Sequence, residues 1–529
     1  MRVFEAAHKS MKAFLMHKDQ DFDINRKLPS NEQALVQDLG LETLFNAMAR
    51  GDTLVYEVAK SAVLSGVTND RNTILYRQNI LKDCLRNPFI VRAIYNIAGE
   101  AMKKEKREQW GIFSDYPSTI LHRSIRVLHM FMTMLKELKR IADKQAERFE
   151  SEGFTAFFAM LRRELGDEYF ASVEKHLRAL KFRGGVLISA ELGQGNKGTN
   201  YVLRISQEKE QGWRNRILAQ KLRVYTFHIH PRDQSGARAL SELSDRGIHL
   251  VANALAQSTD HILSFFSMLR TELAFYIGCL RLHGQLAQKA TCFPVCVASS
   301  ERRLSFHGLY DLGLTFGLEQ GIVANDVNAD NKDLVIITGA NQGGKSTLLR
   351  SIGVSQVMMQ CGMFAPAESF SSNVCDGVFT HYKRKEDATL KSGKLDEELS
   401  RMSDIVDNMT SRSIVLFNES FAATNEREGA EIARQIVFAL CEKRVKMIFV
   451  THLYEFARVI CDKRMENVLF LRAEREADGR RTFNLVEGEP LQTSYGEDLY
   501  KSIFGVGTDN PKARAKKGSR NGTVPASGR

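Results

Sequence analysis

The sequence lacks the features that mark secreted, membrane-embedded or zinc-binding proteins. Its 529 residues contain eight scattered cysteines, of which only Cys292 and Cys296 lie close together, and no second pair completes a zinc site. The first residues of the sequence lack the apolar region of a secretory signal, and no apolar run approaches the length of a membrane span. These absences predict reduced thiols, a cytoplasmic location and no membrane partner.

Negative charge is also in short supply. The 74 Lys and Arg residues outnumber 63 Asp and Glu residues, and the net charge of +11 favours an anionic partner, nucleic acid above all. Nearly half of this excess lies in residues 506–529, where six basic residues stand against one acidic residue among Gly, Ser, Asn and Pro. We predict a disordered basic tail there, which either contacts DNA or only aids solubility.

A chain of this length is expected to form two to four domains. After an N-terminal extension at residues 1–29, residues 30–290 show the apolar spacing that is typical of long, packed helices. Two stripes carry this spacing most clearly: Leu121, Ile125, Leu128, Met132 and Leu135, and then Ile262, Phe266, Leu269, Leu273, Tyr276 and Leu280. They indicate lever-like helices, although each stripe alone also fits the core of an ordinary helix bundle.

A β insertion near residues 182–231 interrupts the helical pattern. Residues 184–191 and 200–206 flank a Gly-rich stretch and predict a β-hairpin, and residues 222–229 predict a third strand. Basic residues surround the insertion, namely Lys197, Arg204, Lys209, Arg214, Arg216, Lys221 and Arg223. The hairpin tip therefore either contacts DNA or forms a solvated charged surface.

A different pattern begins after a connector at residues 291–305. Short β-branched runs alternate with helical segments up to residue 505, at residues 334–338, 378–382, 414–417, 447–451 and 468–471. Such alternation predicts an α/β sheet that binds its ligand at the carboxyl ends of the strands. The fold class is therefore α + α/β, with an all-helical domain that carries a small β insertion, followed by an α/β domain at residues 306–505.

The most specific motif is a glycine-rich loop between the first of these strands and a helix. It matches G-x-x-x-x-G-K-[ST] and consists of Gly339, Ala340, Asn341, Gln342, Gly343, Gly344, Lys345, Ser346 and Thr347. Its backbone N–H groups would bind phosphates, Lys345 would reach the β- and γ-phosphates, and the Ser346 hydroxyl would bind Mg²⁺. The alternative, a chance Gly-rich turn, does not explain the flanking strand and helix.

Two later strands end in polar residues that fit nucleotide hydrolysis. One leads into Asn418 and Glu419, and another leads into His452. Asn418 would contribute to the Mg²⁺ shell, and Glu419 would act as general base or orient the attacking water. His452 would sense or stabilise the γ-phosphate. The Glu386–Asp387 pair is a weaker candidate for reporting on Mg²⁺, and a solvated loop is the favoured interpretation there.

In combination these motifs resemble the MutS family of DNA mismatch-repair ATPases. The phosphate loop, the strand ending in Asn418 and Glu419, the histidine at residue 452 and a Ser-Tyr-Gly tripeptide at residues 494–496 occur in the family's order. Residues 322–326 resemble the segment before the family's loop, whose Asn (Asn325 here) approaches the nucleotide. The resemblance implies a P-loop ABC-type ATPase domain that uses ATP and Mg²⁺, forms a homodimer through its nucleotide sites and binds DNA.

The chain departs from the family pattern at several positions. Asn418 replaces the usual Asp, and the signature that the second subunit contributes is replaced by Gly393 and Lys394, so that Lys394 would approach a phosphate across the dimer. The first thirty residues contain no Phe-x-Glu wedge, which favours structured DNA over single mispairs. Two hypotheses stay open: slow ATP hydrolysis that controls a DNA clamp, or a nucleotide-gated switch or scaffold with negligible turnover, with or without DNA.

Overall fold

The computed structural model describes residues 11–109, 116–182, 185–204, 225–317, 321–384, 393–476 and 481–491. Its contacts divide the chain into two compact units. The helical unit comprises Met1–Asn331, Arg350–Thr380 and Ile405–Val415, and the phosphate-loop unit comprises Lys332–Leu349, His381–Asp404 and Leu416–Arg529. The predicted connector at residues 291–305 lies within the range of the helical unit.

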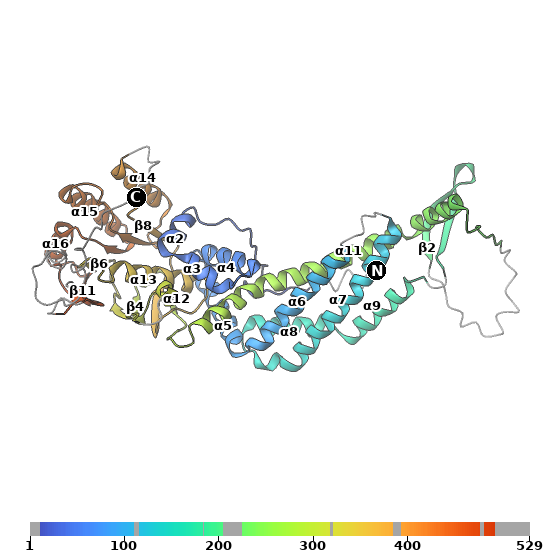
Figure 1. The fold of residues 1–529 in the computed structure, drawn as a ribbon, viewed down its shortest axis with the longest axis horizontal. Helices are drawn as coiled ribbons and strands as arrows, with labels where there is room; N and C mark the ends of the chain where they lie inside the picture. The colour runs from blue at the N-terminus through green and yellow to red at the C-terminus, as the bar shows by residue number, and fades with distance from the viewer. Residues whose placement is uncertain are drawn as a thin grey trace, which may run out of the picture. The chain divides into compact units, whose positions relative to one another are not determined.

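Most of the helical unit is built from helices that precede residue 290. They are α2 (Glu32–Leu39), α3 (Leu41–Ala49), α4 (Thr53–Gly66), α5 (Arg71–Arg86), α6 (Pro88–Gln109), α7 (Pro117–Gln145), α8 (Glu152–Glu164), α9 (Asp167–Ala179) and α11 (Gln234–Gln285). The side chains of Asp52, Asp70 and Ser151 begin α4, α5 and α8 by accepting backbone N–H bonds of the first turn. The three longest helices, α6, α7 and α11, run side by side (Figure 1).

The two apolar stripes form the core between these helices. All the stripe residues from Leu121 to Leu135 in α7 and from Ile262 to Leu280 in α11 are buried, and the rings of Phe131 and Phe266 lie 5.5 Å apart. The predicted long helices are therefore confirmed. One window of α11 is apolar enough to cross a membrane by composition, but 67% of it is buried inside the structure, as in the core helix of a folded domain.

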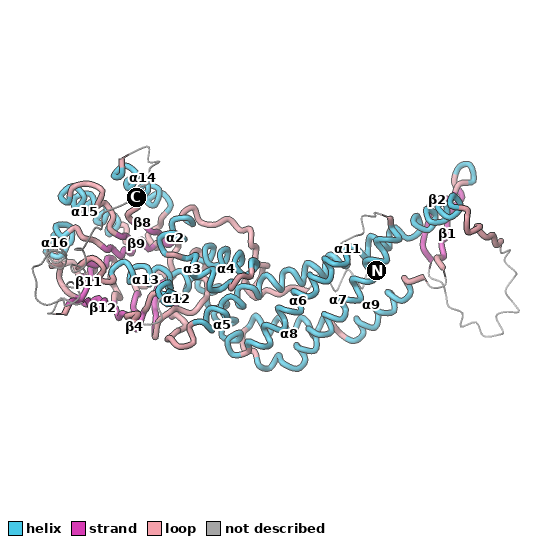
Figure 2. The backbone as a smooth tube through the Cα atoms, viewed as in Figure 1, coloured by secondary structure: helices cyan, strands magenta, loops and turns pink. Residues whose placement is uncertain are grey.

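The β insertion forms the predicted hairpin but not the predicted third strand. β1 (Leu187–Leu192) pairs antiparallel with β2 (Gly198–Arg204), and β2 contacts α11 (Figure 2). Residues 225–229, the described part of the expected third strand, form no strand, and Tyr225 and Phe227 are 81% and 79% exposed. The prediction was wrong because strand propensity acts through a packed face and a neighbouring strand, and this described segment has neither.

An N-terminal strap, residues 11–22, is held against the helices by its own backbone. Glu272 of α11 accepts the N–H groups of Leu15 (2.5 Å) and Phe22 (3.0 Å) through its two carboxylate oxygens. The buried Arg77 of α5 donates to a strap carbonyl at 2.8 Å. The strap is therefore part of the core of the helical unit.

A four-stranded sheet belongs to the helical unit as well. Its order is β3 (Val295–Val297), β7 (Ser369–Asn373), β4 (Leu304–Leu309) and β5 (Asn325–Asn328). β3 is parallel to β7, whereas β4 is antiparallel to both β7 and β5. The short helix α12 (Leu312–Gly317) follows β4.

The main sheet has six strands and carries the phosphate loop. Its order is β12 (Arg481–Glu487), β11 (Val468–Arg475), β6 (Leu334–Thr338), β10 (Lys446–Val450), β9 (Ile414–Asn418) and β8 (Val378–Tyr382). β6 runs parallel to both β10 and β11, and β12 is antiparallel to β11. The helices between these strands are α13 (Lys345–Gln360), α14 (Lys394–Asn408), α15 (Glu426–Glu442) and α16 (Tyr454–Asp462). The predicted fold class, a helical region with a small hairpin followed by an α/β sheet, is confirmed.

Candidate nucleotide site

Neighbouring strands of the main sheet bring the predicted polar residues together. The phosphate loop follows β6, Asn418 is the last residue of β9 with Glu419 next to it, and His452 lies just beyond β10. The Glu419 N–H donates to the carbonyl of Val450 at 2.9 Å, which joins the ends of β9 and β10. The topology therefore gathers residues that are far apart in the sequence.

Close packing requires the glycines of the phosphate loop. Gly339 and Gly344 have φ angles of 120° and 89°, in the region that favours glycine. A Cβ atom at Gly339 or Gly343 would lie 2.9 or 2.8 Å from the Cβ of Ala473 on β11, and one at Gly344 would lie 3.1 Å from the carbonyl oxygen of Phe483. The loop thus exposes bare backbone, as N–H groups need to approach phosphates.

Lys345 begins α13, and its side chain lies within the loop. Its Nζ donates to the carbonyls of Gly339 and Ala340, both at 2.8 Å, and the residue is only 4% exposed. Burial lowers the pKa of Lys345 to about 8, and the nearby carboxylate of Glu419 opposes this shift. The ammonium group is therefore mostly charged at neutral pH and positioned to bind an anion.

The two predicted magnesium residues are in direct contact. The Ser346 hydroxyl donates to Oδ1 of Asn418 at 2.8 Å. Both side chains offer oxygen, the ligand atom that Mg²⁺ prefers, but neither carries a charge. The described part of the chain contains no group of three or more His, Cys, Asp or Glu side chains that would hold a metal by themselves. The pair therefore fits a Mg²⁺ ion that depends on nucleotide phosphates for its remaining ligands.

Glu419 and His452 form the other side of the site. Nε2 of His452 lies 3.1 Å from Oε1 of Glu419 and 3.4 Å from Nζ of Lys345. The hydrogen bond from His452 lowers the pKa of Glu419, and the charges of His452 and Lys345 add to this effect, while burial opposes it. Glu419 is therefore ionised at neutral pH, as a general base or water-orienting group requires.

The remaining loop residues lie at its outer turn and at the start of α13. Asn341 and Gln342 are exposed, and Oε1 of Gln342 accepts a hydrogen bond from Arg481 of β12 at 2.6 Å. Thr347 is half-buried in the first turn of α13. The loop is thus supported by β12 as well as by β11.

Two predicted residues belong to other elements. Lys394 is the first residue of α14, and Asn325 is a buried residue at the start of β5 in the helical unit. Several further predictions lie outside the described residues, namely those on Glu386–Asp387, the Ser-Tyr-Gly tripeptide, the basic residues between 205 and 224, and the tail at residues 506–529.

Three polar residues next to the site were missed by the sequence patterns. Arg481 supports the loop, whereas His381 of β8 and Ser420 are buried and hydrogen-bonded to each other behind Glu419. The position of Ser420 directly after Glu419 is the one signal that the sequence offers for this pair. No sequence pattern singles out His381.

Comparison with known families agrees with this arrangement. Residues 69–289 match the MutS2 N-terminal domain, and residues 335–504 match MutS domain V. The chain belongs to the MutS family. MutS domain V is an ATPase domain, and the match to it contains the phosphate loop and the ends of β9 and β10. The family resemblance inferred from the motifs is therefore confirmed.

The relatives of this chain include proteins named DNA mismatch repair protein MutS. The one from Salinibacter ruber is 28% identical over 257 residues, which cover 45% of this chain and 28% of the relative. The one from Parabacteroides distasonis is 38% identical over 143 residues (26% of this chain, 16% of the relative). The one from Lactococcus lactis subsp. cremoris is 25% identical over 361 residues (63% and 42%). The matched region thus spans less than half the length of each of these relatives.

Proposed function

We propose that this MutS-family chain binds Mg²⁺ and ATP, hydrolyses ATP slowly and clamps DNA as a nucleotide-controlled homodimer. The observation that carries this proposal is the convergence of Lys345, Ser346, Glu419 and His452 at the ends of three strands of the main sheet. We place this activity in DNA repair or recombination on structured DNA rather than on single mispairs. We also place it in the cytoplasm, which the eight free cysteines support.

The chemistry follows from the positions of these groups. The loop N–H groups and the Lys345 ammonium bind the phosphates, so the bonds from Lys345 to loop carbonyls are exchanged for bonds to phosphate oxygens. Bound Mg²⁺ supplies positive charge against the phosphates. Glu419 is ionised and directs the attacking water, and the hydrogen bond from His452 fixes one of its carboxylate oxygens.

Two substitutions separate ATP binding from hydrolysis. Lys345→Ala should weaken ATP binding by about a hundredfold or more, because it removes a charge-assisted donor. Glu419→Gln should bind ATP normally and lose about a hundredfold or more in turnover, which is the usual worth of a general base. Lys332→Ala serves as the control, because this half-buried lysine of the same unit bonds the carbonyl of Glu466 rather than a residue of the site.

The measurements are equilibrium binding of a fluorescent ATP analogue and phosphate release by the purified chain. Normal hydrolysis by Lys345→Ala would reject the assignment of the site. Unchanged turnover in Glu419→Gln would remove Glu419 as the base.

Asn418 supports a second candidate, a nucleotide-gated switch with negligible turnover. Its amide is a weaker Mg²⁺ ligand than the carboxylate usual in the family. Phosphate release with and without DNA distinguishes the two candidates. Turnover that DNA stimulates rejects the switch, whereas tight ATP binding without turnover in either condition supports it.

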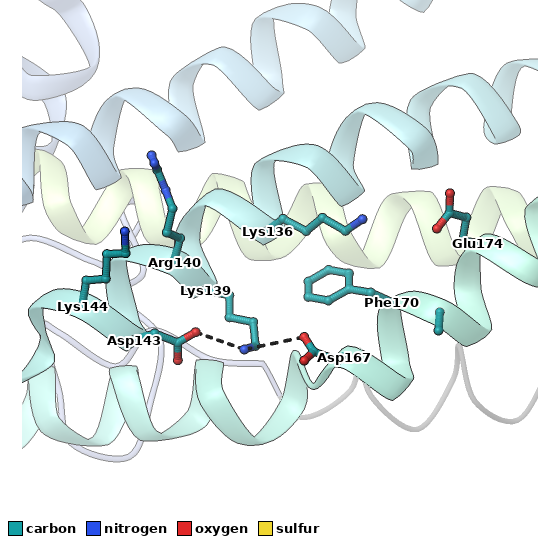
Figure 3. Close-up of a pocket in the computed structure, with 9 residues that line it drawn as sticks. Lys136, Lys139, Arg140, Asp143, Lys144, Asp167, Phe170 and Glu174 are labelled. Carbon is teal, nitrogen blue, oxygen red and sulfur yellow. Dashed lines mark hydrogen bonds and ion pairs between the residues drawn. The ribbon is translucent and has the colours of Figure 1, made fainter.

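A basic ridge on α7 supports an anionic partner such as DNA. Lys136, Arg140 and Lys144 recur every four residues on α7 and line a pocket that α9 completes (Figure 3). Residues at this spacing lie on one face of a helix. Figure 3 shows Lys139 of the same pocket lying between Asp143 (3.0 Å) and Asp167 (3.9 Å). Lys139 is thus neutralised locally, whereas the ridge faces solvent and fits a phosphate backbone.

Salt dependence tests DNA as the partner. Binding to duplex, branched and single-stranded DNA should weaken steeply as salt rises. Changing Lys136, Arg140 and Lys144 together to Gln should reduce the slope of log affinity against log salt by roughly 3, because each basic side chain that neutralises a phosphate adds about one to the slope. An unchanged slope would remove the ridge from the interface, and the absence of binding to all three DNAs would favour the switch without DNA.

The proposed homodimer is tested through Lys394. If this lysine approaches the nucleotide of the second subunit, ATP should promote dimers of Glu419→Gln, and adding Lys394→Ala should weaken them. Sedimentation velocity with and without ATP measures both effects. ATP-independent mass in every variant would contradict dimerisation through the nucleotide sites.

A further inference from the structure

The residues on either side of Ser420 have an unusual backbone conformation. Glu419 and Phe421 have φ angles of 55° and 62°, in the left-handed region that residues with a side chain seldom adopt. Such conformations persist only where the surrounding structure holds them, and they cluster at functional sites. The turn that directs Glu419 toward the nucleotide site therefore needs support from the buried residues that pack against it.

His381 and Ser420 supply that support from the buried side. Nδ1 of His381 lies 2.8 Å from the Ser420 hydroxyl, and both residues are fully buried. The same hydroxyl donates to the backbone carbonyl of His381 at 2.5 Å. One hydroxyl thus contacts two acceptor positions of a single residue on the neighbouring strand β8.

The hydrogen bonds determine which ring nitrogen of His381 carries the proton. Nε2 lies 3.0 Å from the backbone carbonyl of Glu398, which can only accept, so Nε2 must donate. Burial lowers the pKa of His381 to about 4, so the ring is neutral at physiological pH and Nδ1 is an acceptor. The Ser420 proton is therefore shared between Nδ1 and the carbonyl of His381.

Ring packing closes the turn on its other side. The rings of His381 and Phe421 stack at 5.1 Å with an angle of 20° between their planes, and Phe421 is fully buried. Gly429 of α15 lies so close that a Cβ atom there would be 2.3 Å from the carbonyl oxygen of Phe421. The turn is thus held by hydrogen bonds at Ser420 and by packing at Phe421.

We propose that His381 and Ser420 are positioning residues that hold Glu419 for ATP hydrolysis and tie it to α14, an inference that rests on the proposed ATPase function. Glu398 is the link, because its backbone carbonyl accepts from Nε2 of His381 at 3.0 Å. Burial raises the pKa of its carboxyl group, and the nearby N–H of Phe421 opposes this shift. Glu398 lies in the first turn and a half of α14, the helix that begins at Lys394. A partner subunit that engages Lys394 therefore acts on the turn that carries Glu419.

Two variants test the pair without altering the phosphate loop. Ser420→Ala removes the shared hydroxyl, and His381→Phe keeps a stacked ring while removing both ring nitrogens. Each should lower the single-turnover rate by about ten- to a hundredfold, as displacement of a catalytic group does, with ATP affinity within about twofold of the parent chain. The double variant should lose less than the two single losses combined, because both single variants remove the hydrogen bond between Ser420 and Nδ1 of His381.

Ser355→Ala is the matched control, since Ser355 is equally buried and its hydroxyl has no hydrogen-bond partner among the described residues. It should leave the rate unchanged. Unchanged rates in Ser420→Ala and His381→Phe would overturn the proposal. Equal losses of rate and ATP affinity would also overturn it, because they would indicate general disruption of the site.

Hydrogen exchange of the peptide at residues 414–421 gives a readout that does not depend on turnover. Both variants should raise its exchange rate, whereas Ser355→Ala should not. If the parent chain hydrolyses no more ATP than Lys345→Ala, the proposed ATPase function fails and the exchange data alone decide the positioning role. Unchanged exchange in both variants overturns the inference whatever the turnover.

Discussion

The N-terminal strap should loosen as the pH rises toward neutrality, because the carboxyl group that holds it is buried. Glu272 is fully buried in α11, and its oxygens accept the N–H groups of Leu15 and Phe22. Burial raises the pKa of Glu272 to about 7, and the charge of Asp21 adds to this shift. The hydrogen bonds from the strap oppose the shift but do not cancel it.

The size and sign of the effect follow from that pKa. A rise in the pKa of Glu272 from its ordinary value of 4.5 to about 7 corresponds to a free-energy difference of roughly 3 kcal/mol between the closed and the opened strap. The closed strap retains a proton that the opened strap loses. The stabilisation is therefore fully present below pH 4.5, declines as the pH approaches 7 and is absent above it.

Hydrogen exchange of residues 11–22, corrected for the chemical exchange rate at each pH, measures this opening. Glu272→Gln removes the titrating group, so protection of the parent strap relative to this variant should fall by roughly a hundredfold between acidic and neutral pH. The variant has one acceptor oxygen fewer and should be less protected at acidic pH. Parallel pH profiles for the two chains would refute the assignment of this titration to Glu272.

Two further predictions concern the magnesium pair and the helical core. Asn418→Asp keeps the acceptor for the neighbouring serine and adds a charge, so the Mg²⁺ concentration for half-maximal turnover should fall by about tenfold, or about 1.4 kcal/mol. A turnover titration with Mg²⁺ checks this, and an unchanged midpoint would contradict it. Gly66→Ala would place a Cβ atom 2.6 Å from the Cβ of Cys361. It should lower the free energy of unfolding of the helical unit by about 1–3 kcal/mol, seen as a lower thermal midpoint.

Periodicity predicted those elements whose burial repeats along the chain. Apolar residues recur at helical spacing in α7 and α11, and they form continuous runs in the fully buried strands β6 and β10. These patterns predicted the four elements correctly. β7 was not predicted because its sequence, Ser369–Asn373, is mostly serine, and it becomes a strand by pairing with β3 and β4. The position of the N-terminal strap was not predicted, because hydrogen bonds from its backbone to distant side chains hold it. Such bonds produce no periodic pattern in the sequence.

The nucleotide site, too, contains residues that sequence patterns predicted and residues that they did not. The phosphate loop and the residues at the ends of β9 and β10 are contiguous motifs, so their positions could be predicted from sequence. The pairing of Ser346 with Asn418 could be expected, since both were assigned to Mg²⁺. His381 and Ser420 could not be paired in advance, because their contact depends on β8 and the turn after β9 lying together. A buried polar pair of this kind is defined by topology rather than by spacing.

The residues that we propose bind ATP and those that we propose hydrolyse it are held by different contacts in this fold. Lys345 and Ser346 already make hydrogen bonds within the site, each worth about 1 kcal/mol net, so nucleotide binding exchanges bonds rather than adding them. Glu419 is held from behind by the pair on β8 and the following turn, none of which belongs to the loop. Substitutions behind Glu419 should therefore change the rate without changing ATP affinity. Asn418 lies between the two parts, because it bonds Ser346 and directly precedes Glu419, and it is the position where both quantities should respond to one substitution.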